Sequence, residues 1–323
     1  MVRRGRLWIG CVAFLAALTC GCQNSAKTPA AAPAPPDPIA EARQEIEQGR
    51  PDAALAKLLT AAQGPENLCL QGAAWAKKAK GAPLPTPTIG ADGVPVTAEF
   101  KSEEQRAIDL FQRALSAKPD LAEAHLGLAE LLVPHAIRRY ELGAASRRAR
   151  PRRRGAAPTP APAPAEPLLE PGGIVEHFKA ASKDPKLALR ALDGLARFAT
   201  RVDRPEDREW AYRGLVDAEP ENPSRLVELG DFLVKERGDP NGAIAEYKQA
   251  LVWKPDSPEI KAKIADIYIE EGRAAFQAEQ WAVAEARFVT AQEWVTDPNS
   301  AQGLRVRDYR SKLDAIRRTP GRR

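Results

Sequence analysis

The sequence predicts an all-α protein: a stack of about six helix pairs, closed by a C-terminal capping helix. Two observations predict it, namely a small apolar pattern that recurs six times and a proline that follows each copy. The pattern is a small residue, usually alanine, then a bulky apolar residue four positions on and an alanine three positions later. This i, i+4, i+7 spacing lies on one face of an α-helix, and its short side chains let a neighbouring backbone come close.

The six copies recur from residue 54 to residue 291. They are Ala54–Leu58–Ala61, Ala107–Phe111–Ala114, Ile174–Phe178–Ala181, Ala211–Leu215–Ala218, Ala243–Tyr247–Ala250 and Ala284–Phe288–Ala291. Proline disfavours helix at its own position and at the residue before it, so each following proline marks a helix end. These prolines are Pro65, Pro119, Pro185, Pro220, Pro255 and Pro298. One such helix is marginal in water, whereas stacked copies bury the shared face.

A second apolar helix precedes several copies. Before Ala243 it reads Leu226, Leu229, Gly230 and Leu233. With this first helix, the pattern resembles the tetratricopeptide repeat (TPR) over most of residues 37–318. The resemblance implies a right-handed α-solenoid over residues 39–318, whose first helices line a groove for an extended peptide or a partner helix. The alternative is an irregular helical bundle.

The spacing of the copies departs from the family's period of 34 residues. Successive copies begin 53, 67, 37, 32 and 41 residues apart. Insertions at 81–102 and 143–173, each between the two helices of a pair, explain the first two steps. We expect the first to hold only a short strand near Val94–Val96 and the second, rich in arginine and then in proline and alanine, to be disordered. A first helix running from Ile260 to Ala278 would absorb the last step.

The amino terminus predicts export. Three arginines within the first six residues precede the apolar run Leu7–Leu18, which is too short to span a membrane. The ending at Gly21–Cys22 resembles a bacterial lipoprotein signal. The resemblance implies that residues 1–21 are removed, that Cys22 carries lipid, and that 22–38 is an Ala/Pro-rich tether on a protein of the cell envelope. A plain cleaved signal and an uncleaved anchor are the alternatives.

The positive charge is local. The formal net charge is +5, yet eight basic residues lie within 302–323, which includes the basic tail 319–323. Six more lie in the second insertion, at Arg147, Arg148, Arg150, Arg152, Arg153 and Arg154. Such a cluster can bind an anionic lipid or polymer, and the alternative is a solvated loop without a partner. The export signal disfavours nucleic acid.

No catalytic motif is present. The three histidines, His125, His135 and His177, belong to no zinc-binding or haem-binding motif, and there is no phosphate-binding loop or nucleophile turn. Cys69 is expected to be a buried, inert thiol. We expect no enzyme activity, no cofactor and no metal. The predicted function is a membrane-anchored scaffold that binds protein partners through its groove. The alternative is binding of an anionic lipid or polymer through Arg147–Arg154.

Overall fold

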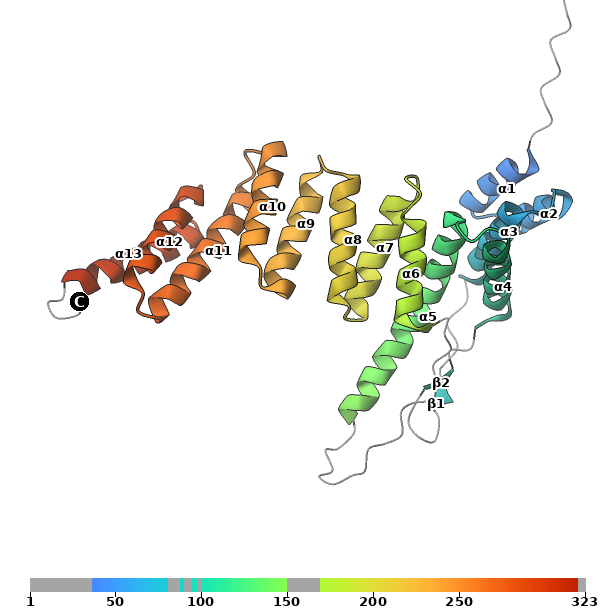
Figure 1. Ribbon diagram of the computed structural model, residues 1–323, viewed down its shortest axis with the longest axis horizontal. Helices are drawn as coiled ribbons and strands as arrows, with labels where there is room; N and C mark the ends of the chain where they lie inside the picture. The colour runs from blue at the N-terminus through green and yellow to red at the C-terminus, as the bar shows by residue number, and fades with distance from the viewer. Residues whose placement is uncertain (1–36, 81–87, 90–94, 98–99, 150–168, 319–323) are drawn as a thin grey trace, which may run out of the picture. The chain divides into compact units, whose positions relative to one another are not determined.

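The computed structural model describes residues 37–80, 88–89, 95–97, 100–149 and 169–318. In this part of the chain six helix pairs follow one another, each packed on the next (Figure 1). They are α1 (Pro38–Glu47) with α2 (Pro51–Thr60), α3 (Pro65–Ala79) with α4 (Ser102–Ala117), α5 (Ala122–Ala149) with α6 (Pro171–Ala181), α7 (Ala188–Arg201) with α8 (Pro205–Ala218), α9 (Pro223–Phe232) with α10 (Pro240–Trp253), and α11 (Pro258–Gln277) with α12 (Trp281–Trp294). A last helix, α13 (Ala301–Arg318), packs on α11 and α12. The predicted all-α, TPR-like solenoid with a capping helix is confirmed.

The recurring pattern marks the second helix of every pair. Its central residues are buried in all six helices, from Leu58 in α2 to Phe288 in α12. Ala218 differs from the other alanines, because it is exposed. It is the last residue of α8, whereas Ala181, the last residue of α6, is buried, and nothing in the structure explains the difference. The prolines behave as expected, and Pro65 in addition begins the next helix, where its missing N–H costs nothing.

Aromatic rings of the second helices lie directly on glycines of the first helices. A Cβ on Gly230 of α9 would lie 2.5 Å from the Tyr247 ring of α10, and one on Gly272 of α11 would lie 2.7 Å from the Phe288 ring of α12. Phe111 of α4 fills the space between two such sites: Gly72 in α3 of its own pair, and Gly127 in α5 of the next. Only a residue without a side chain leaves room for these rings.

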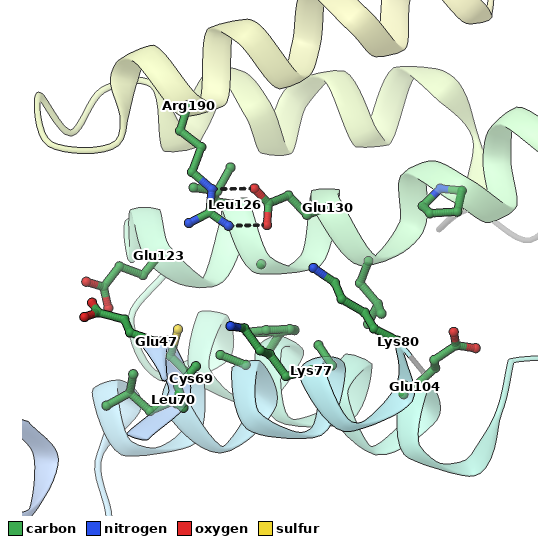
Figure 2. A pocket seen from close by; sticks show the side chains of 18 of the residues that line it. Glu47, Cys69, Leu70, Lys77, Lys80, Glu104, Glu123, Leu126, Glu130 and Arg190 are labelled. Atoms are coloured by element: carbon green, nitrogen blue, oxygen red, sulfur yellow. Dashed lines mark hydrogen bonds and ion pairs between the residues drawn. The ribbon is translucent and has the colours of Figure 1, made fainter. Parts of the chain in front are cut away.

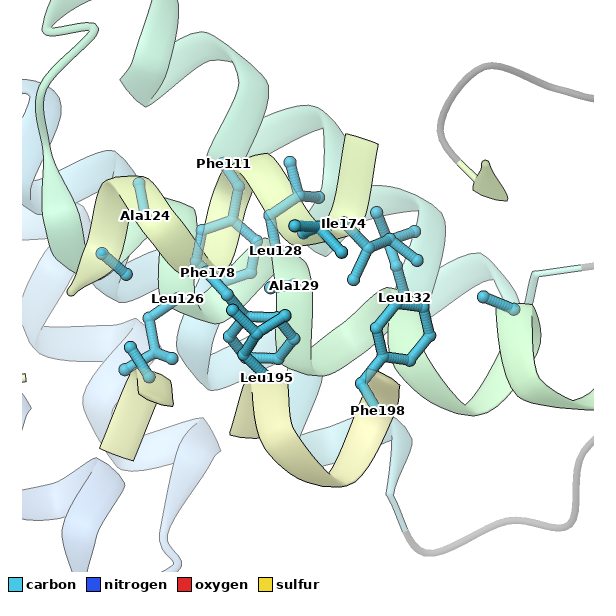
Figure 3. Close-up of a cluster of buried hydrophobic side chains, with 14 of the residues drawn as sticks. Phe111, Ala124, Leu126, Leu128, Ala129, Leu132, Ile174, Phe178, Leu195 and Phe198 are labelled. Atoms are coloured by element: carbon cyan, nitrogen blue, oxygen red, sulfur yellow. The ribbon is translucent and has the colours of Figure 1, made fainter. Parts of the chain in front are cut away.

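The buried residues form four clusters along the stack. The largest joins α3 to α8 and includes Phe111, Phe178 and Phe198 (Figure 3). Smaller clusters lie around α1–α3, α9–α11 and α11–α13. Half-buried residues connect them, since Tyr212 packs against both the large cluster and the α9–α11 cluster, and Tyr268 against the last two.

Both insertions differ from expectation at their edges. The first holds a hairpin of two short antiparallel strands, β1 (Thr88–Ile89) and β2 (Pro95–Thr97), instead of a single strand. The second begins later than predicted, because α5 continues through residues 143–149 to Ala149. Alanine and arginine favour helix there, and the next proline is Pro151. The expected long first helix is α11, and its C-cap is Ala278. After α9 the backbone continues as a π-helical turn, η2 (Leu233–Arg237), which ends at Gly238 with φ 62°.

The arginines of α13 form ion pairs with neighbouring helices. The many basic residues near the C-terminus instead predict a solvated outer face on this helix. Arg305 pairs with Asp266 and Glu270 of α11, and Arg317 pairs with Glu285 of α12. Leu304 is 51% exposed, so Val306 and Leu313 form the buried side. The cap is therefore held by charge as well as by apolar contact.

Replacing Gly127 with alanine should destabilise the protein by about 2 kcal/mol, because the new Cβ would meet the fully buried Phe111 ring at 2.5 Å. The matched control is Gly172→Ala in α6, whose Cβ would find its nearest neighbour at 3.6 Å. Urea unfolding followed by circular dichroism should show this control at wild-type stability or slightly above it. Equal effects of the two substitutions would contradict the ring-on-glycine packing.

Candidate functional site

Ion pairs join the first helices to one another along one face of the stack, here called the first-helix face. Each rung connects a carboxylate on one helix to a base on another, with a shortest N···O distance between 2.6 and 3.3 Å. The rungs are Arg43–Glu123 (α1 to α5), Glu130–Arg190 (α5 to α7), Asp193–Arg225 (α7 to α9), Asp231–Lys263 (α9 to α11) and Asp266–Arg305 (α11 to α13). Exposed pairs of this kind each contribute at most about 1 kcal/mol, but each of them engages one carboxylate and one base of the face.

A groove with a volume of about 550 Å³ opens on this face between α1, α3 and α5, at the edge of α7 (Figure 2). Its apolar wall comes from Ile46 of α1, from Leu70, Ala73 and Ala76 of α3, and from Leu126 and Leu131 of α5. The volume is within the range of ligand sites and accommodates one or two large side chains. Ile46, Leu70 and Leu126 are buried, so the apolar surface that a partner would cover belongs mainly to the half-buried Ala73, Ala76 and Leu131.

Charged side chains form the rim of the groove. At one end Arg43 pairs with Glu123, with Nη1 to Oε1 at 2.6 Å, and along the α7 edge Arg190 makes two bonds of 2.7 and 2.6 Å to Glu130. Lys77 and Lys80 are exposed, and neither forms an ion pair with any residue that the structure describes. Figure 2 shows both lysines projecting from α3 toward the space between α3 and α5.

A buried polar pair lies at the other end of the groove. His135 is 3% exposed and Glu104 is 6% exposed, and His135 Nε2 lies 3.5 Å from Glu104 Oε1. Glu104 also accepts a bond of 2.9 Å from the Lys101 backbone N–H, which caps the start of α4. Burial lowers the pKa of His135, although Glu104 opposes this. A neutral histidine here fixes the α4–α5 contact, and this role requires no ligand.

Cys69 lies in the groove wall but is nearly inaccessible. It is 2% exposed, and burial raises the pKa of its thiol to about 12. The carboxylate of Glu123 acts in the same direction, while Arg43 opposes it. The thiolate, which is the reactive form, is therefore suppressed at neutral pH.

His125 and His177 form a pair that the sequence does not reveal. His125 of α5 and His177 of α6 face each other, with their Nδ1 atoms 2.8 Å apart, while His125 Nε2 lies 2.8 Å from the Pro119 carbonyl oxygen. One nitrogen must donate and the other accept, so both rings cannot be charged. Burial, with the neighbouring His125 as a second cause, lowers the pKa of His177 to about 4.

Most of the lipid-bearing and anion-binding residues expected from the sequence fall outside the described part of the chain. Cys22 and the signal fall outside the described residues, as do Arg150, Arg152, Arg153 and Arg154. The backbone of Arg147 and Arg148 belongs to the last turn of α5. Within the described ranges no group of three His, Cys, Asp or Glu side chains could hold a metal ion, and no helix has the length and apolar character needed to cross a bilayer.

The groove residues carry no signal in the sequence. Lys77 and Lys80 look like ordinary solvated lysines at the end of a helix, and Leu126 looks like an ordinary core residue. These residues come together only because α1, α3 and α5 pack on one another, and this packing cannot be inferred from local sequence spacing. The one available hint is that Lys77 and Lys80, at i and i+3, share a helix face.

No protein-family model matches this chain, and no curated protein matches it. Solved structures similar to it include one titled for PilF of Pseudomonas aeruginosa, at 13% identity and a TM-score of 0.40, covering 85% of this chain and 96% of that one. MamA of Desulfovibrio magneticus is 17% identical with a TM-score of 0.34, covering 69% of this chain and 99% of its own. A structure titled as a thermophilic TPR protein of Thermus thermophilus is 17% identical with a TM-score of 0.23, covering 86% and 97%. These likenesses assign no role to this chain.

The His125–His177 pair should make the protein acid-sensitive. Between pH 6.5 and about 4 the unfolded chain protonates His177 while the folded chain does not, so stability is complete above this window and falls as the pH drops through it. Allowing for the partial exposure of His177, the loss should be about 2 kcal/mol. His177→Gln should reduce the difference in unfolding free energy between pH 7 and pH 4.5 by that amount. An unchanged difference, measured by urea unfolding, would contradict the assignment.

Proposed function

We propose that this protein is a non-enzymatic scaffold of the bacterial cell envelope that docks segments of partner proteins in the first-helix groove. The observation that carries the proposal is the groove of about 550 Å³ with its apolar wall of Leu70, Ala73, Ala76, Leu126 and Leu131, on a face where ion pairs join the first helices. A repeat stack of this kind offers a surface and not an enclosed reaction centre. The TPR resemblance of the sequence supports a protein partner.

The membrane address is part of the same proposal. The arginines, the short apolar run and Gly21–Cys22 support a lipid-bearing Cys22, and two or more acyl chains hold a protein stably at a bilayer. The Ala/Pro-rich residues 22–38 would then link the anchor to the helical body. The arginines of 147–154 are proposed only as a second contact, to an anionic lipid or polymer.

Photo-crosslinking should locate the docking surface. With a photoreactive phenylalanine in place of Ala76, at the groove, irradiated cells should yield discrete crosslinked adducts. The matched control places the same group at Ala245, an exposed alanine of α10 that does not line the groove. Adducts of the same mass from both positions, or from position 245 alone, would refute docking in the groove.

The lipid anchor predicts a separate result. In cells fed a clickable palmitate analogue, the wild-type chain should be labelled and should sediment with membranes. Cys22→Ser should abolish the labelling and release the protein from the membrane fraction, since the acylated sulfur is lost. Cys20→Ser is the control and should behave as wild type. Labelling that survives Cys22→Ser would reject the assignment.

A further inference from the structure

The distribution of charge on the first-helix face distinguishes the groove from the rest of the stack. From α7 to α13, the rungs Asp193–Arg225, Asp231–Lys263 and Asp266–Arg305 already pair carboxylates with bases. Asp231 is further engaged by the Tyr247 hydroxyl, which donates to it at 2.6 Å. A charged ligand would have to break these contacts to bind there. The charges of these three rungs are therefore unavailable to a charged partner.

The groove contains basic side chains that pair with no described carboxylate. Arg43 and Arg190 are each held by a glutamate through two bonds, at 2.6 and 3.2 Å and at 2.7 and 2.6 Å. Lys77 and Lys80 are exposed, extend over the same opening, and pair with no described carboxylate. Neighbouring Lys78, by contrast, points to Asp52 of α2, with Nζ to Oδ1 at 2.6 Å. Two ammonium groups without a described carboxylate partner therefore lie beside the apolar wall. The exposed carboxylate of Glu47, which also lines the groove and acts on Arg43, is the one acidic group there without a described ion pair.

We propose that the occupant of the groove is an acidic protein segment that carries a large apolar side chain. The apolar side chain would enter the space between Leu70, Leu126 and Leu131, and carboxylates beside it would meet Lys77 and Lys80. The two lysines lie one helical turn apart, so two acidic residues of the same segment can reach them. Charge-assisted bonds at the edge of an apolar site are stronger than in open water. This inference rests on the proposed docking function of the groove.

Selection of random twelve-residue peptides displayed on phage, against the immobilised full chain, tests the proposal. Enriched peptides should be net negative and contain leucine, isoleucine, phenylalanine or tryptophan beside Asp or Glu. The best of them, synthesised with a fluorophore, should bind in anisotropy titrations and weaken as salt rises. Replacing its apolar residue with serine should weaken binding at least tenfold.

Variants of the chain connect the binding to the lysines. Lys77→Glu with Lys80→Glu should weaken binding of the acidic peptide at least tenfold. The double variant Lys118→Glu with Lys183→Glu changes the net charge equally at two exposed lysines outside the groove, and should stay within twofold of wild type. Thermal melts of both variants establish that they fold.

Three results would overturn the proposal: enrichment of neutral or basic peptides, equal weakening by both double variants, or no enrichment at all. If adducts still form at position 76 in cells in any of these cases, docking in the groove stands and only the acidic, apolar chemistry falls. If those adducts are also absent, both fall together.

Discussion

The contact on which this structure depends is an aromatic ring lying on a glycine. Phe111, Tyr247 and Phe288 each lie against a glycine of a first helix in their own pair, and Phe111 also meets Gly127 of the next pair. Each ring excludes water from a seam between helices, and each glycine lets the backbones approach closely enough for the ring to be covered on both sides. The relative positions of α3, α4 and α5, and with them the groove, follow from this contact.

Ion pairs on the first-helix face decide which charged groups a partner can reach. The rungs between first helices contribute little stability individually, yet they determine which carboxylates and bases remain available to a partner. Where α1, α3 and α5 meet, Glu123, Glu130 and Glu104 are engaged by Arg43, Arg190 and His135, while Lys77, Lys80 and Glu47 form no described ion pair. The charge that the groove presents to a partner thus depends both on the ion pairs between first helices and on the charged side chains that remain unpaired.

The sequence predicts the second helices well, because their buried triads are local and recur with helical spacing. It predicts less where the outcome depends on a distant neighbour. Pro134 lies inside α5 and ends no helix, Ala218 carries the pattern but faces water, and Arg305 is drawn to Asp266, 39 residues away. A groove along the first helices follows from the TPR resemblance, but its lining residues and the His125–His177 pair could not be predicted, since they lie on different helices and share no spacing rule.

Tyr212 and Tyr268 lie where one buried cluster gives way to the next, and each is only half covered. Side chains that bridge two dense regions without belonging fully to either act as joints. Ala73 of α3 has the same position between the α1–α3 cluster and the largest cluster. Because Ala73 also lines the groove, a partner bound there would cover the link between the first two clusters.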